Sequence, residues 1–233
     1  MPNMRWVYRV VLILSTIAGV RVTALAASDD APQGKASVYQ MVTGDDSDED
    51  RNRWDAIYSA KGYVYGKEPA AFLKSHIQIL PIGRALDIAM GEGRNAVFLA
   101  KKGFNVEGVD LSEVALTKAK RLAKAARVHI TTINADLNSY VIKPDHYNVI
   151  INIDYLQRNL IPQIKRGLKK GGVVVFENFT IDQLKNEAGK NTPKDYLLGQ
   201  GELRELFKDM EILVYRESND GINAVASLIA RKP

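Results

Sequence analysis

From residue 54 onward, short β-rich runs alternate with longer helical ones, and this alternation constrains the fold more than any other feature. Several of the short runs are apolar almost throughout, such as NVIINI at 148–153 and VVVF at 173–176. Strands covered by helices on both faces have this composition. We therefore expect an α/β fold with a doubly wound, mostly parallel, Rossmann-like sheet. Seven strands are expected, at residues 84–88, 105–109, 129–134, 147–153, 172–179, 210–216 and 224–230.

Helix signals lie between these strands. Gly103 is suited to end a helix at 95–102, and Ser112 is suited to N-cap a helix at 113–126. A third helix, at 160–168, leads into the turn residues KKGG before the fifth strand. The last two strands are joined only by residues 217–223, with a turn at Gly221. We therefore expect them to form an antiparallel C-terminal hairpin at the sheet edge.

The first 26 residues have the order of a secretory signal peptide. Arg5 and Arg9 precede the apolar run VVLILSTIAGV, and Ala24-Leu25-Ala26 is a suitable cleavage site. The run is shorter than the about 20 residues that span a bilayer, so no stable membrane span is expected. An uncleaved interfacial anchor and a true start at Met41 are the alternatives. The protein is expected to be exported (periplasmic or secreted) if the signal is real, and cytoplasmic if translation starts downstream.

An acidic segment follows the signal. The run DDSDED at 45–50 lacks the spacing of a calcium loop. Like charges repel and keep a chain extended, so residues 27–53 are expected to be a solvated acidic linker. The globular domain is then expected at residues 54–233.

Composition excludes several classes of protein. The chain has no cysteine, which excludes disulfides, a cysteine nucleophile, zinc–thiolate sites and iron–sulfur clusters. Its three histidines are scattered, so no metal site is expected. The formal net charge is +5, but three arginines lie in residues 1–27, and without them the balance is only +2. No nucleic-acid partner is expected at such a low charge.

The sequence ALDIAMGEGRN at 85–95 joins the first strand to its helix through a loop that contains Gly91 and Gly93. Ligands of such sheets bind at the carboxyl ends of the strands. Glycines there let a ligand approach the backbone, and a helix N-terminus favours a negative group. A tight strand-to-helix turn without a ligand remains the alternative.

Acidic residues end the next two strands as well. Asp110 ends the second strand, where a carboxylate can accept hydrogen bonds from both hydroxyls of a ribose. Asp136 follows the third strand, where an acid can accept a hydrogen bond from the amino group of an adenine. Each acid alone could be a helix cap or a turn residue. Together with Asp87 they place acids at three successive strand ends.

These motifs resemble those of class I S-adenosylmethionine-dependent methyltransferases. The shared features are Asp87-x-Ala89-x-Gly91-x-Gly93, GVD at 108–110, NADL at 134–137 and the terminal hairpin. The closest resemblance is to bacterial tellurite-resistance-like methyltransferases, through YVYGKEP at 63–69 and GEGRNAVFLAKKGFNVEGVDLS at 91–112.

The resemblance implies S-adenosylmethionine as cofactor. It implies that Asp87, Ala89, Gly91 and Gly93 surround the methionine part of the cofactor, with Arg94 at its carboxylate. Asp110 would hold the ribose, and Asp136 and Leu137 would flank the adenine. The full set of expected cofactor-binding residues is Asp87, Ala89, Gly91, Gly93, Arg94, Asp110, Leu111, Asp136, Leu137 and Ile153. Ala89 departs from the family pattern, because it replaces the first glycine of the loop.

Candidate residues for the methyl acceptor lie in two segments. Asp154, Tyr155 and Arg158 follow the fourth strand and are the candidate catalytic residues, and Tyr63 and Tyr65 are the candidate substrate residues. The alternatives are a helix cap for Asp154, a lid packed on the core for the tyrosines, and a surface role for Arg158.

After the fourth strand, NIDY at 152–155 lacks the Pro-Pro-aromatic motif with which amino-methyltransferases grip a planar nitrogen. This weighs against an amine acceptor. Soft nucleophiles need little help from a general base. The sequence thus predicts methyl transfer to a small, soft acceptor, a thiol or a chalcogen compound.

Two other functions remain open. A nicotinamide-dependent oxidoreductase also uses a glycine loop and a ribose-binding acid, but Asp87 and the terminal hairpin favour the methyltransferase. A methyltransferase-like fold could also be a non-catalytic module that binds a small molecule. Neither the acceptor's identity nor the oligomeric state follows from the sequence.

Overall fold

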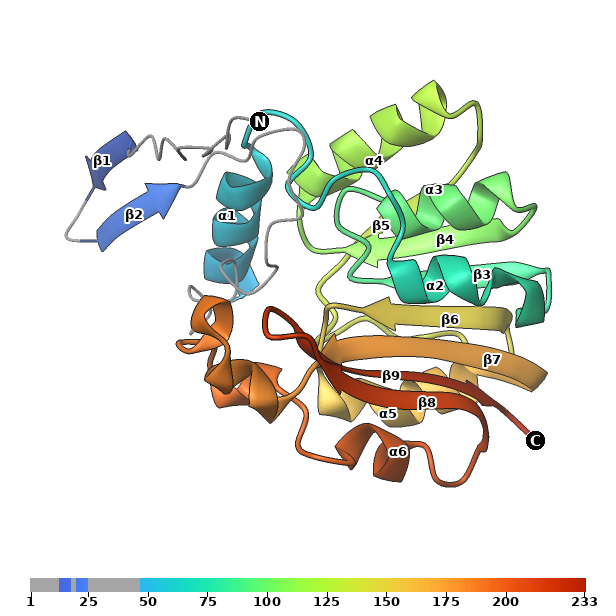
Figure 1. Cartoon of the computed structure of the whole chain (residues 1–233). Coiled ribbons are helices and arrows are strands. Elements are labelled where there is room, and N and C mark those ends of the chain that lie inside the picture. Colours follow the sequence, from blue (N-terminus) through green and yellow to red (C-terminus); the bar gives the residue numbers. More distant parts are fainter. Residues whose placement is uncertain (1–12, 18–19, 25–46) are drawn as a thin grey trace, which may run out of the picture.

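The computed structural model describes residues 13–17, 20–24 and 47–233 (Figure 1). Its main feature is a seven-stranded sheet of order β5-β4-β3-β6-β7-β9-β8. The pairs from β5 to β7 are parallel, whereas β9 is antiparallel to both β7 and β8. The strands are β3 (Arg84–Ile88), β4 (Asn105–Asp110), β5 (Thr131–Asn134), β6 (Tyr147–Ile153), β7 (Leu168–Phe179), β8 (Glu211–Asn219) and β9 (Ala224–Arg231). The predicted α/β sheet with its C-terminal hairpin is confirmed.

Helices cover the sheet on both faces. Those of the described chain are α1 (Ser47–Tyr58), α2 (Ala71–Ser75), α3 (Arg94–Lys101), α4 (Glu113–Ala125), α5 (Ile161–Gly167) and α6 (Glu202–Leu206). Short 3-10 helices are η2 (Ile77–Ile79), η3 (Arg158–Leu160), η4 (Ile181–Lys185), η5 (Glu187–Gly189) and η6 (Lys194–Tyr196). As predicted, Ser112 caps α4, because its hydroxyl accepts a hydrogen bond from the amide of Ala115 at 3.0 Å.

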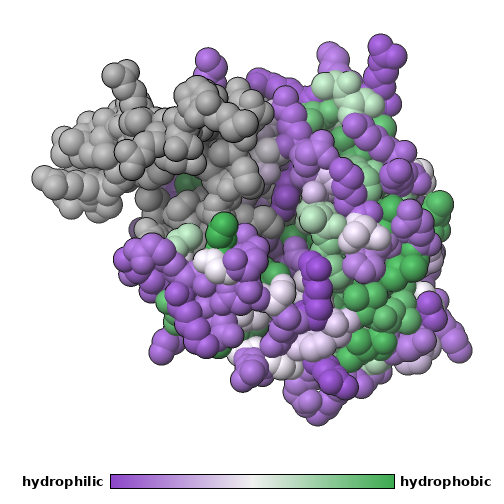
Figure 2. Space-filling model, viewed as in Figure 1, coloured by the Kyte–Doolittle hydropathy of each residue, from purple (hydrophilic) through white to green (hydrophobic). Residues whose placement is uncertain are grey.

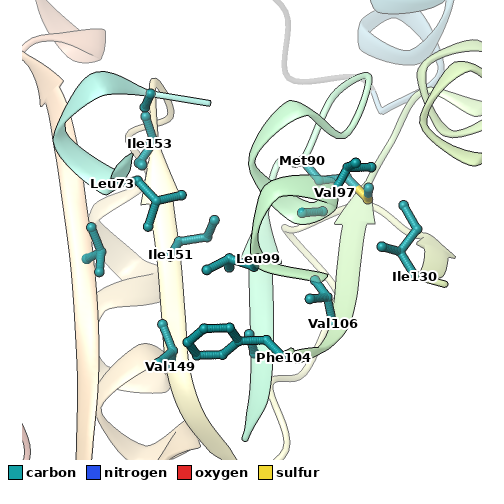
Figure 3. Close-up of a cluster of buried hydrophobic side chains, with 14 of the residues drawn as sticks. Leu73, Met90, Val97, Leu99, Phe104, Val106, Ile130, Val149, Ile151 and Ile153 are labelled. Carbon is teal, nitrogen blue, oxygen red and sulfur yellow. The ribbon is translucent and has the colours of Figure 1, made fainter. Parts of the chain in front are cut away.

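The core has two main clusters, one on each face. Leu73 of α2 and Leu99 of α3 pack against Val149 and Ile151 of β6 in the first cluster (Figure 3). Helices α5 and α6 pack in the second cluster, which includes Ile150 of the same strand. Neighbouring residues of β6 thus point to opposite faces, as the period of two residues in a strand requires. Burial of both faces explains the nearly continuous apolar runs.

The turn expected before the fifth strand lies inside β7. Tyr147 pairs with Leu168 and Val149 with Val173, so the residues KKGG form an irregularity in the strand. Gly172 is required there, because a Cβ would lie 2.8 Å from the Lys169 carbonyl oxygen and 3.0 Å from that of Tyr147. The strand therefore begins four residues earlier than residue 172, the predicted start.

The prediction that residues 27–53 form a linker is wrong for residues 47–53, because α1 begins at Ser47. Asp48, Glu49 and Asp50 lie in the first turn of α1, where the helix dipole stabilises negative charge. Arg51 and Arg53 each pair with the acid three residues earlier. The acidic run thus includes a helix N-terminus rather than only solvated chain. Residues 27–46 lie outside the described residues.

The expected signal peptide lies mostly outside the described residues. Two of its segments are described, β1 (Ile13–Ile17) and β2 (Val20–Ala24), which pair antiparallel. Its export and cleavage stay predictions.

Within the described part of the chain, no helix has both the length and the apolar character needed to cross a membrane. Figure 2 shows hydrophilic residues over much of the described surface of one face.

Candidate functional site

A cavity of about 320 Å³ lies where the carboxyl ends of β3, β4 and β6 meet. The loops after these strands form one wall, through residues such as Ala89, Leu111 and Ile153. Helix α1 and η6 contribute further residues, among them Trp54 and Tyr196. Figure 1 shows α1 on the same side of the sheet as the segment of η4 to η6 (orange). The site thus lies at the edge that the sequence predicted.

The glycine loop follows β3 in a left-handed backbone conformation. Ala89 and Gly91 have φ values of 52° and 53°, and both border the cavity. A Cβ on Gly91 would lie 2.9 Å from the Tyr58 hydroxyl oxygen, and one on Gly93 would lie 2.8 Å from the Ala119 Cβ. Gly93 does not border the cavity, contrary to its expected cofactor contact. Its role is to let α3 pack closely on α4.

Asp110 connects the glycine loop to the start of α4. Its carboxylate accepts hydrogen bonds from the Gly91 amide at 2.7 Å and from the Ser112 amide at 2.9 Å. Burial raises the pKa of Asp110 to about 6, although both backbone hydrogen bonds oppose the increase. At neutral pH this group is therefore mostly an ionised acceptor at the wall of the cavity.

Asp87 is buried within β3 and does not border the cavity, although a cofactor contact was expected. One of its carboxyl oxygens, Oδ2, has no hydrogen-bond partner. Burial raises the pKa of Asp87 to about 8, and the positive charge of Arg94 opposes this increase. An unpaired buried carboxyl oxygen is costly, so this position is suited to a cationic or donor group.

The residues expected around an adenine are brought together. Asp136 and Leu137 follow β5 and border the cavity together with Leu111 and Ile153. One oxygen of Asp136 accepts a hydrogen bond from the Asn138 amide at 2.8 Å, which fixes the carboxylate. Its other oxygen is the one suited to a ligand.

Arg94 and Asp154 form an ion pair of 2.9 Å on the cavity wall. Their side chains are only 14% and 12% exposed. Asp154 has a φ of 64°, and its amide donates to the Glu177 carbonyl oxygen at 2.9 Å. Such backbone strain in a non-glycine residue is typical of functional sites. The candidate catalytic residue Asp154 is thus held by Arg94, the residue expected at the cofactor carboxylate.

The tyrosines divide between the cavity and the core. Tyr65 and Tyr155 border the cavity, and burial raises the pKa of both phenols, which keeps them neutral at physiological pH. Tyr155 donates a hydrogen bond to Gln157 at 2.5 Å. Tyr63 is not at the cavity but packs beside the core, and its hydroxyl donates to the Lys118 carbonyl oxygen at 3.3 Å. Tyr63 therefore lies away from the cavity at which a substrate contact was expected.

Arg158 does not border the cavity either, so a direct catalytic contact is not supported. Its guanidinium binds both carboxylate oxygens of Glu202, at 2.5 and 2.9 Å. It also donates to the Leu197 carbonyl oxygen at 2.9 Å. These bonds join η3 to α6 and to the chain before it.

The sequence reasoning missed the contribution of α1. Asp50, Trp54 and Tyr58 all border the cavity, and the two aromatic rings stack with centroids 5.7 Å apart. The i, i+4 spacing of the aromatic residues was a helix signal. Asp55 anchors the helix, because its carboxylate accepts hydrogen bonds from the Ser112 hydroxyl and the Val114 amide. Glu92, Asn95 and Tyr196 were missed as well.

Comparison with known families agrees with this site. The family model of the tellurite resistance protein TehB matches residues 54–225, which is most of the chain. The chain belongs to the TehB family. The resemblance predicted from the glycine loop and the segment before it is confirmed.

A similar curated relative in the TehB family is the probable S-adenosyl-L-methionine-dependent methyltransferase TehB of Haemophilus influenzae. It is 25% identical over 139 residues, which cover 58% of this chain and 48% of the relative. The chain spans about half the length of the curated relatives named TehB that it matches.

Solved structures share the fold. The crystal structure of TehB from Haemophilus influenzae has a TM-score of 0.60 at 20% identity, and the match covers 78% of this chain and 67% of that one. Magnesium protoporphyrin IX methyltransferase from Synechocystis PCC 6803, solved with bound SAM, has a TM-score of 0.58 at 17% identity. That match covers 82% of this chain and 99% of the other.

Proposed function

We propose that this protein transfers a methyl group from S-adenosylmethionine to a small, soft acceptor, such as a thiolate or a chalcogen anion. The observation that carries the proposal is the convergence of Gly91, Asp110 and Asp136 on one cavity. Membership of the TehB family, whose relative in Haemophilus influenzae is described as a probable S-adenosyl-L-methionine-dependent methyltransferase, supports it.

The chemistry of the cavity fits this cofactor. Asp110 would accept hydrogen bonds from the ribose hydroxyls, and Asp136 and Leu137 would flank the adenine. Asp87 does not border the cavity in this structure, so its unpaired oxygen would accept a hydrogen bond from the ammonium of the methionine part after a local rearrangement that opens it to the cavity. Gly91 leaves room that a Cβ would take, because Tyr58 lies directly opposite. S-adenosylmethionine supplies a methyl group on a positively charged sulfur, which a nucleophile attacks in line.

The acceptor side supports a nucleophile that needs no strong base. The Asp154 carboxylate is bound to the Arg94 guanidinium at 2.9 Å, so it is engaged by a cation rather than available as a base. Tyr65 has a neutral phenol that can donate a hydrogen bond to an anion, whereas the Tyr155 hydroxyl already donates to Gln157. A thiolate or selenide is already a nucleophile near neutral pH, whereas an amine or hydroxyl must first lose a proton.

The test is methyl transfer from radiolabelled S-adenosylmethionine by the full chain, with hydrogen sulfide, 2-mercaptoethanol and hydrogen selenide as acceptors. Methylamine serves as the comparison. We expect labelled methyl products from the soft acceptors and none from the amine. Binding of S-adenosylhomocysteine without turnover on any acceptor would instead indicate a non-catalytic binding module. An absence of binding by the folded protein would reject the cofactor itself.

Replacing Arg158 with alanine separates a structural role from a catalytic one. The loss of its bonds to Glu202 and to backbone carbonyls should lower the free energy of unfolding by about 1–2 kcal/mol. S-adenosylhomocysteine affinity should stay within about twofold, since Arg158 is not at the cavity. Urea unfolding and calorimetric titration measure the two quantities. A large loss of methyl transfer in a variant of unchanged stability would restore the catalytic assignment.

A further inference from the structure

Residues 59–70 join α1 to α2 and are called the strap here. The strap contains no helix or strand, yet it brings Tyr65 and Gly66 to the wall of the cavity. In Figure 1 it runs from α1 past α4 to α2. A segment without regular structure needs other contacts to hold its side chains in place.

Two side chains of the glycine-loop region bind the strap backbone. One Glu92 oxygen accepts a hydrogen bond from the Val64 amide at 2.7 Å. The Asn95 side-chain oxygen accepts one from the Ala70 amide at 2.8 Å. Both side chains thus provide an acceptor for an amide of the strap, one residue before Tyr65 and one residue before α2.

Lys118 of α4 completes this connection. Its ammonium binds the other Glu92 oxygen at 2.9 Å and donates to the carbonyl oxygens of Ala60 and Gly62, each at 2.8 Å. The Glu92 and Lys118 side chains are only 3% and 15% exposed. A buried ion pair contributes little net stability compared with apolar packing. Its effect in this structure is geometric, because it ties the glycine loop to the start of the strap.

We propose that Glu92 and Asn95 are positioning residues, which hold the strap so that Tyr65 covers the acceptor side of the cavity. The inference rests on the proposed methyl transfer. Glu92 lies between the two glycines of the loop, so a cofactor that orders the loop also orders the strap. Coupling of this kind is reciprocal, and the strap in turn holds the loop in its binding conformation.

The first test is hydrogen–deuterium exchange of the full chain with and without S-adenosylhomocysteine. In the native protein we expect the ligand to slow exchange of the strap amides. Without ligand, Glu92→Ala and Asn95→Ala should each raise exchange there about tenfold or more, because an amide loses its acceptor. Glu92→Gln keeps an oxygen for the Val64 amide and should lie in between.

The matched control is Lys74→Ala. Lys74 forms an exposed ion pair with Glu68 of the strap at 3.2 Å, and this pair involves no residue of the glycine loop. Its removal should leave strap exchange and ligand protection unchanged. Asn95→Ala provides an independent test if Glu92→Ala does not fold.

The second readout is catalytic, with hydrogen sulfide as the probe acceptor. We expect kcat/KM for sulfide to fall about tenfold in Glu92→Ala and Asn95→Ala, and S-adenosylhomocysteine affinity to weaken as well, because the coupling between strap and loop is reciprocal. Strap exchange that does not respond to the ligand or to these variants would overturn the inference. Bound ligand that protects the strap, without any sulfide methylation, would instead count against the proposed acceptor class alone.

Discussion

Replacing Asp110 with asparagine should weaken binding of S-adenosylhomocysteine by about 10- to 100-fold. The two carboxylate oxygens accept from the Gly91 and Ser112 amides. An asparagine keeps one oxygen and places an amide donor against the other N–H group. The mismatched N–H group displaces the loop from its binding conformation, and the loss of a charged acceptor for the ribose costs about 1–3 kcal/mol of binding free energy. Calorimetric titration of the full chain measures the change.

The matched control is Asp145→Asn. Asp145 lies just before β6, at the opposite end of the strand from the cavity, and forms an exposed ion pair with Lys232. Its φ of 47° is a conformation that asparagine tolerates well. We expect ligand affinity to stay within about twofold in this variant. Equal affinity in the Asp110 and Asp145 variants would show that Asp110 does not hold the ligand.

Much of the fold follows from the sequence because the sheet is buried on both faces. The bounds of β3 and β6 agree with the prediction at both ends, and β6 is a mostly apolar run of the kind that is buried on both faces. Asp110 and Asp136 were assigned for a similar reason. Parallel strands bring their carboxyl ends to one edge, so side chains that follow separate strands meet in space.

The errors lie where tertiary contacts override local signals. The run DDSDED indicated a linker, but the packing of Trp54 and Tyr58 and the Asp55 bonds to α4 hold the segment as a helix. The strap has no hydrophobic period, so the sequence could not show that Tyr65 faces the cavity and Tyr63 the core. The sequence predicted a catalytic role for Arg158, because its partner Glu202 lies 44 residues further along the chain and gives no local signal.

Binding of S-adenosylhomocysteine should strengthen as the pH rises, because Asp87 must lose its proton to accept the ligand's ammonium. Burial raises the pKa of Asp87 to about 8, so in the free protein most of it is protonated at pH 7. An ammonium beside the unpaired oxygen favours the ionised form. Asp110, with a pKa of about 6, is already mostly ionised above pH 6.5. Between pH 6.5 and 7.5 the affinity should therefore increase nearly tenfold, following the ionised fraction of Asp87.

The variant Asp87→Asn tests whether Asp87 causes this dependence of ligand affinity on pH. Asparagine does not titrate, so the dependence of affinity on pH in this window should become flat, with weaker binding at pH 7.5. Calorimetry in two buffers of different ionisation enthalpy should detect release of close to one proton per ligand bound by the native protein at pH 7. A native affinity that is constant between pH 6.5 and 7.5 would contradict an Asp87 contact with the ammonium.

The Asp87 carboxyl group should also make the free energy of unfolding of the ligand-free protein depend on pH. This free energy should fall as the pH rises, whereas the ligand affinity increases. A folded-state pKa above the unfolded value means that the folded protein binds the proton more tightly. The stabilising contribution of Asp87 is then complete below about pH 4 and is lost as the pH rises through about 8. The stability of Asp87→Asn relative to the native protein should accordingly increase over this range in urea unfolding. A buried acid that lowers the stability of the ligand-free protein but increases its affinity for the ligand is expected where the fold is adapted to a cationic ligand.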